Sequence, residues 1–157
     1  MAVILTGSVG MGGKNNASDI LAIQNLLNKW INPKIIANGV CNSTLDDPTV
    51  KAIKSFQSKF TSSPDGRVDP GGGTLKRLNS EPFVQLTQMS GLGYYSYGSD
   101  FSNRQWGTPN TIQALKDIAQ QFKLNNPTAQ IGIGDISFQF GGQMSPHSTH
   151  KEGLHVD

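Results

Sequence analysis

The segment DPTVKAIKSFQ, residues 47–57, decides the fold of the first half of the chain. Apolar residues recur in it every three or four positions, which predicts a helix with one buried face. That face comprises Val50, Ile53, Phe56 and, just beyond the segment, Phe60. Pro48 suits the first helical position, where its fixed φ and missing N–H do no harm. We therefore expect a helix from about Asp47.

Two more helices are predicted on either side of this segment. Residues 18–30 place Ile20, Ile23, Leu27 and Trp30 on one face. Ser18 is the expected N-cap of this helix, and Asp19 lies in its first turn. A shorter helix is expected around Leu75 and Leu78, after the turn residues 63–66. The three helices predict a small bundle, near the lower size limit for a domain that folds without cross-links.

The second half of the chain has a different character. Residues 80–107 are rich in glycine and tyrosine and show no clean periodicity, so we place a boundary near residue 82 and expect domains at 1–82 and 83–157. Three tyrosines in this stretch could line a substrate cleft or pack at the boundary: Tyr94, Tyr95 and Tyr97.

A longer helix is predicted after residue 107. Thr108 is its expected N-cap, Pro109 its first residue, and it should end near Asn125. Residues 131–140 are expected to be extended and partly buried, and a glycine pair at 141–142 follows them.

Composition excludes several classes of protein. The formal net charge is +2, and lysine and arginine form no run with interleaved aromatics, so no nucleic-acid partner is predicted. No apolar stretch approaches the ~18 residues of a membrane span. Cys41 is the single cysteine, so no disulfide framework is expected. The first residues, MAVILTG, lack the features of a signal peptide, which predicts synthesis in the cytoplasm and delivery outside the general export route.

Residues 17–79 resemble the peptidoglycan-binding domain found on many cell-wall hydrolases. The matching segments are IQNLL at 23–27, TVKAIKSFQ at 49–57 and PDGRVDP at 64–70, with Thr74 and Leu75. The resemblance implies peptidoglycan as a partner. Without it, Gln24 and Gln57 would be expected to face solvent. The chain departs from the family in having Asn38-Gly39 where Asp-Gly is usual, and in a longer insert through Cys41 to Asp46.

The stronger signal for chemistry lies at the carboxyl end. IGDIS at 133–137 and the glycine pair precede PHSTHKEGLHVD at 146–157, where His147, His150 and His155 fall close together. Catalytic zinc takes imidazole and carboxylate ligands, using three from the protein and leaving one position for water. Six residues separate His150 from Asp157, and one of them is a glycine. This spacing allows a loop and a following strand to turn both side chains toward one ion.

This run resembles the penicillin-insensitive murein endopeptidases, in detail over residues 131–157 and loosely back to about residue 90. The resemblance implies that His150 and Asp157 are zinc ligands and that His147 supports the metal site. It gives Asp135 a structural role at a turn and assigns none to His155. Glu152 is expected to be solvated.

The resemblance also implies hydrolysis of a peptide bond in the stem or cross-bridge of peptidoglycan by a zinc-activated water. In the family, the third ligand and the general base come from a His-x-His pair on a later strand, whereas this sequence stops at Asp157. We therefore expect no catalytic base within the chain, and a 157-residue polypeptide that is inactive alone. A truncated or cleaved enzyme, a second C-terminal fragment, or substitution by His147 or His155 would each account for this.

Taken together, the sequence predicts an α+β protein: a three-helix peptidoglycan-binding bundle followed by a partial α+β zinc-peptidase domain. The alternative function is a non-catalytic wall-binding module. Action in the periplasm or cell wall would make the protein a phage lysis enzyme or an antibacterial effector of a type VI secretion machine. An effector would be accompanied by an immunity protein and by the secretion machinery as partners.

Overall fold

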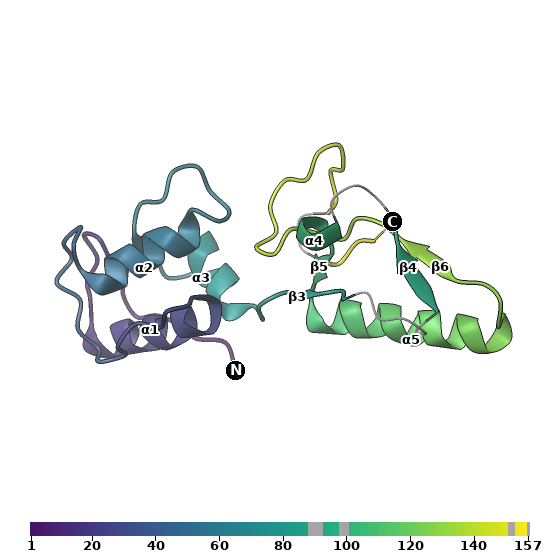
Figure 1. Cartoon of the computed structure of the whole chain (residues 1–157). Coiled ribbons are helices and arrows are strands. Elements are labelled where there is room, and N and C mark those ends of the chain that lie inside the picture. The colour runs from purple at the N-terminus through teal and green to yellow at the C-terminus, as the bar shows by residue number, and fades with distance from the viewer. Residues whose placement is uncertain (88–92, 98–100, 151–152, 157) are drawn as a thin grey trace. The chain divides into compact units, whose positions relative to one another are not determined.

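A computed structural model describes residues 1–87, 93–97, 101–150 and 153–156. It divides the chain into two compact units, an N-terminal unit of Met1–Ser80 and a C-terminal unit of Glu81–Asp157 (Figure 1). None of the helices in the described part of the chain has both the length and the apolar character needed to cross a membrane.

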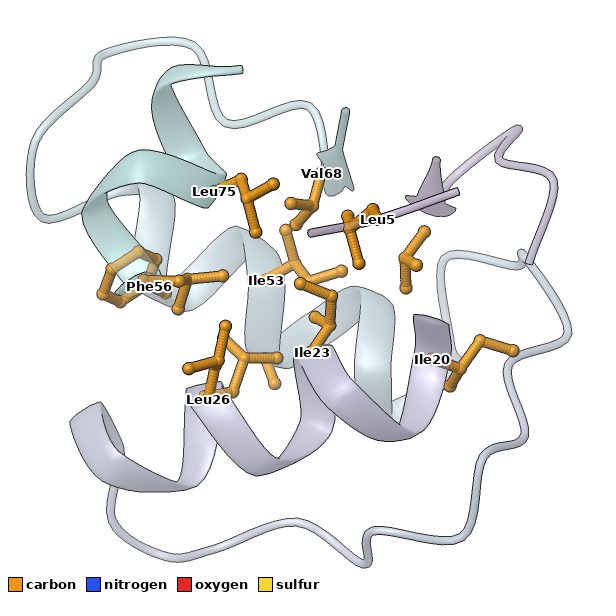
Figure 2. Close-up of a cluster of buried hydrophobic side chains, with 12 residues drawn as sticks. Leu5, Ile20, Ile23, Leu26, Ile53, Phe56, Val68 and Leu75 are labelled. Atoms are coloured by element: carbon orange, nitrogen blue, oxygen red, sulfur yellow. The ribbon is translucent and has the colours of Figure 1, made fainter. Parts of the chain in front are cut away.

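The N-terminal unit contains three helices and a two-stranded antiparallel ribbon. The helices are α1 (Ala17–Trp30), α2 (Pro48–Gln57) and α3 (Gly73–Asn79), and the ribbon pairs β1 (Val9–Gly10) with β2 (Arg67–Val68). Its core gathers apolar side chains from all of these elements, as Figure 2 shows. Ile23, Ile53 and Phe56 lie at its centre and are almost completely buried. The predicted apolar faces of the helices are therefore the faces that pack.

The helix starts are partly as predicted. Asp47 caps α2, since its Oδ1 accepts hydrogen bonds from the N–H groups of Thr49 and Val50. The prediction that Ser18 caps α1 is wrong, because the helix begins at Ala17 and Asn16 occupies the N-cap position. Ser18 faces solvent.

The carboxylate of Asp19, in the first turn of α1, holds the amino-terminal segment. It accepts hydrogen bonds from the N–H groups of Thr6 and Gly7 and from the hydroxyl of Thr6. Burial by itself raises the pKa of Asp19, but these bonds and one from Asn16 outweigh it and hold the pKa below its ordinary value.

The two glutamines expected at the surface are buried, which corrects that prediction. Gln24 on α1 and Gln57 on α2 are 1% and 4% exposed. Gln57 Oε1 accepts from the N–H of Gly66, and its Nε2 donates to Asp65 Oδ1 and to Thr74 Oγ1. Each glutamine thus supplies an acceptor for backbone N–H groups in the loop that follows its helix: those of residues 38 and 39 for Gln24, and that of Gly66 for Gln57.

The C-terminal unit is built around the long helix α5 (Pro109–Asn125), which is capped as predicted by Thr108. Two small sheets accompany it. In one, β3 (Val84–Gln85) is antiparallel to β5 (Trp106–Gly107), and in the other, β4 (Tyr94–Ser96) is parallel to β6 (Ile131–Ile133). α5 lies in the crossover between β4 and β6 (Figure 1). This unit confirms the predicted α+β class.

The predicted strand at residues 131–140 is shorter than expected. Pairing with β4 ends at Ile133, and the chain then turns to the short helix α4 (Phe101–Arg104). There the N–H groups of Ile136 and Ser137 both donate to the carbonyl of Arg104. A buried glutamine, Gln105, ties these segments together, because its side chain accepts from the hydroxyl of Ser96 and donates to the carbonyls of residues 133 and 134.

Candidate functional site

A cluster of charged and imidazole side chains lies beyond the end of β6. Asp135 Oδ2 is 2.8 Å from Arg104 Nη2 and 3.1 Å from His147 Nε2. The three side chains are between 22% and 28% exposed, so the cluster is half-buried. Arg104 Nη2 also donates to the carbonyl of Ser145, which fixes the loop that carries His147. Asp135 therefore bridges α4 to the histidine-rich segment.

The rings of His147 and His150 are stacked, with centroids 4.5 Å apart and planes inclined by 19°. His150 is 3% exposed, whereas His147 lies nearer the surface. The segment that carries them is folded back on itself, since Met144 pairs with His147 in an antiparallel bridge and the Met144 side chain is fully buried. The buried imidazole of His150 is therefore held in place by the fold and is not a surface side chain.

The structure brings together some of the predicted site residues. His147 and His150 are neighbours, and Asp135, predicted to hold a turn, contacts His147 directly. Asp157 and Glu152 lie outside the described residues. His155 is exposed. Arg104 was not singled out from the sequence, because a lone arginine before a glutamine and a tryptophan carries no motif.

Two of the three tyrosines are on the surface. Tyr94 is buried, and its hydroxyl donates to the carbonyl of Thr87. Tyr95 and Tyr97 are 45% and 48% exposed, with ring centroids 6.4 Å apart. Tyr94 thus packs in the core of the C-terminal unit, whereas the rings of Tyr95 and Tyr97 lie at its surface.

The donor set partly fits a zinc ion. His147 and His150 supply imidazole nitrogens, the ligand type that zinc prefers together with carboxylates. Within residues 1–87, 93–97, 101–150 and 153–156, however, no three histidine, cysteine, aspartate or glutamate side chains are grouped to hold a metal ion. The described residues therefore offer part of a ligand set and not a complete centre.

A pocket of about 500 Å³ lies in the N-terminal unit, beneath the α1–α2 loop, residues 31–47. It is lined by Gln24, Lys34, Ile35, Ile36, Asn38, Val40, Asn42, Asp47, Pro48 and Thr49. Its volume is within the ordinary range for small-molecule sites. The loop includes Asn38-Gly39 and the insert through Cys41 to Asp46, the two places where we find the sequence to depart from the usual pattern of the peptidoglycan-binding domain.

The carboxylate of Asp47, at the floor of this pocket, is fully engaged. Besides capping α2, it accepts from the N–H of Asn42 through Oδ2. Burial raises the pKa of Asp47, but the backbone hydrogen bonds from Asn42, Val50 and Thr49 outweigh it and hold the pKa below its ordinary value.

Comparison with known proteins finds a similar family for part of each unit. Residues 16–78 match the family model of the putative peptidoglycan binding domain. Over these residues the first unit is similar to that class of domain. No curated protein and no solved structure is significantly similar to the chain.

Residues 85–157 match the family model of the penicillin-insensitive murein endopeptidases. Over these residues the second unit is similar to this peptidase family, which is in general a family of metallopeptidases. The predicted layout, a peptidoglycan-binding domain followed by a murein endopeptidase segment, is confirmed.

Proposed function

We propose that this protein is a peptidoglycan hydrolase that cleaves a peptide bond in stem peptides or cross-links. The observation that carries the proposal is the joining of a wall-binding domain to a murein endopeptidase segment in one chain. Such a fusion keeps a hydrolase at its insoluble substrate, because binding through the first domain raises the local concentration of bonds at the second.

The cofactor in this proposal is zinc, with His150 and Asp157 as ligands. When bound, zinc supplies Lewis-acid polarisation of a carbonyl and activation of a water molecule. His147 has a supporting role: its ring packs on the ring of His150, and Asp135 orients it through the 3.1 Å contact. Partners of this kind hold a metal-binding side chain in one orientation. Arg104 in turn holds Asp135.

The test is a digest of purified muropeptides by the natural full-length product, analysed by mass spectrometry. We expect loss of cross-linked species that a chelator abolishes and zinc restores. His150→Ala should abolish this activity. His155→Ala is the matched control, since His155 is exposed, and it should retain activity. Cleavage that survives both chelation and His150→Ala would refute the zinc assignment.

A second candidate is a non-catalytic wall-binding protein. The observation that favours it is the match of residues 16–78 to the peptidoglycan binding domain, which would account for wall binding without any catalysis. The same digest distinguishes the two candidates. A full-length product that sediments with cell walls but leaves every muropeptide unchanged would establish the binding module alone.

The proposal extends to the place of action, which is the periplasm or cell wall, because both domain classes act on the wall. The proposal also includes the route of delivery, either as an antibacterial effector or as a phage lysis enzyme. The two routes predict different results when the protein is directed to the periplasm. An effector should be toxic there and neutralised by a co-expressed immunity protein from its own locus, whereas a lysis enzyme should have no such antagonist.

A further inference from the structure

The pocket beneath the α1–α2 loop has the features of a preformed ligand site. Three side chains, those of Asn28, Gln24 and Ser43, anchor the loop to the rest of the unit. Asn28 exchanges two hydrogen bonds of 2.9 Å with the backbone of Ile35, and Gln24 Oε1 accepts from the N–H groups of residues 38 and 39. Farther along, Ser43 Oγ donates to the carbonyl of Gly10. Because the loop is already ordered, a ligand would bind without the entropic cost of folding it.

Three polar side chains around this pocket, those of Lys34, Asn38 and Asn42, have hydrogen-bond donors to offer. Asn38 Oδ1 accepts from Gln24 Nε2 and from the N–H of Val40, and Asn42 Oδ1 accepts from Thr44. Because the oxygen of each amide is already hydrogen-bonded, its NH₂ group remains available to donate to a ligand. Within the described residues, neither of these NH₂ groups nor the ammonium of Lys34 has a partner.

The apolar part of the pocket is aliphatic and open to solvent. Ile36 is 79% exposed and Val40 is 63% exposed, and Pro48 lies beside them in the lining. The described residues that line the pocket include no aromatic ring, so a sugar ring would find no flat surface on which to stack. The pocket thus suits a ligand with small aliphatic groups and several acceptor oxygens.

We propose that this pocket binds the stem peptide of peptidoglycan, with a stem-peptide carboxylate held by Lys34 and the alanine methyl groups against Ile36 and Val40. A stem peptide combines both features, since it carries alanine methyl groups, backbone carbonyls and free carboxylates. The buried carboxylate of Asp47 accepts from three backbone N–H groups, and within residues 1–87 it forms no ion pair with Lys34. This inference rests on the proposed wall-binding function and specifies its ligand.

The experiment uses the 157-residue chain and two probes, titrated by calorimetry. One probe is a sugar-free tetrapeptide, L-Ala-D-Glu-diaminopimelate-D-Ala, and the other is the peptide-free disaccharide of N-acetylglucosamine and N-acetylmuramic acid. We expect the peptide to bind and the disaccharide not to. Lys34→Ala should weaken peptide binding by about tenfold, and Val40→Asp should do the same or more, because it puts a charged group where the alanine methyl groups would pack.

Two variants are matched controls. Lys76→Ala removes a lysine that is exposed on α3, and Leu45→Asp adds a carboxylate to the same loop at a side chain that is 63% exposed and outside the pocket lining. Both should bind the peptide as the wild type does. Cosedimentation with purified cell walls is measured in parallel for every variant.

Each outcome is decisive for a different statement. Binding of the disaccharide in place of the peptide would overturn the ligand class. Wild-type peptide binding by Lys34→Ala and Val40→Asp would overturn the pocket as the site, while the wall-binding function would stand. A wild-type chain that fails to sediment with cell walls would instead overturn the proposed function.

Discussion

Replacing the buried Gln24 by leucine should destabilise the N-terminal unit by about 2–3 kcal/mol. Leucine has a similar size but can neither donate nor accept a hydrogen bond, so the groups that pair with the Gln24 amide lose their hydrogen bonds. Gln24 Nε2 donates to Thr49 Oγ1 at 2.9 Å, and Gln24 Oε1 accepts from the N–H of Gly39 at 2.9 Å. The same amide also accepts from the N–H of Asn38 and donates to the carbonyl of Val40.

The magnitude follows from which partners water can reach. Thr49 is 2% exposed and Gly39 is half-buried, so their groups lose a partner that solvent does not replace. A buried group without a partner costs about 1–3 kcal/mol. Asn38 and Val40 are exposed, and water can satisfy them at little cost. Two lost partners, partly offset by the added apolar contact of leucine, give the expected figure.

Urea unfolding followed by tryptophan fluorescence measures this change. In a Trp106→Phe background the signal comes from Trp30 alone, which packs against Phe56 in the N-terminal core with ring centroids 5.4 Å apart. Asn25→Leu is the control, because Asn25 is exposed on the same helix, and it should not destabilise the unit. If Gln24→Leu changes the free energy of unfolding no more than Asn25→Leu does, the network around Gln24 does not stabilise the fold.

Three further predictions test other parts of the structure. Because the pKa of Asp19 is lowered on folding, its stabilisation is present above the ordinary carboxyl pKa of about 4 and is lost as the pH falls through the folded pKa; Asp19→Asn should reduce the acid dependence of urea unfolding. Gly93→Ala should cost more than ~2 kcal/mol in thermal unfolding, since φ is +79° and a Cβ would meet the carbonyl of Ala119; Gly142→Ala, at φ +95° in open space, should cost only about 1–2 kcal/mol. Burial raises the pKa of the Cys41 thiol, so iodoacetamide should modify it more slowly than free cysteine at pH 8, and urea should restore the ordinary rate.

Local signals explain what could be predicted from the sequence. Asp47 with Pro48, and Thr108 with Pro109, mark the starts of α2 and α5 because a cap and the first turn lie within four residues. The prediction for Ser18 was wrong because the segment contains other residues that can cap a helix. Asn16 occupies the N-cap position, although its side chain makes no capping hydrogen bond.

The candidate site divides in the same way. His147 and His150 are close in the sequence, and their pairing could be expected. Their link to Arg104 could not, because it passes through Asp135, which is 31 positions from Arg104 in the chain. The assignment of His150 and Asp157 as metal ligands stays a prediction.

The amino-acid sequence by itself determined the α+β class, the order of a peptidoglycan-binding domain and a murein endopeptidase segment, and the faces on which the helices pack, because these depend on periodicity and on short motifs. Only the tertiary structure decided the burial of Gln24 and Gln57, the bridge from Arg104 through Asp135 to His147, and the pocket beneath the α1–α2 loop. These features arise where segments distant in the sequence meet, and the hydrogen bonds that a buried side chain must satisfy are then set by its neighbours in space.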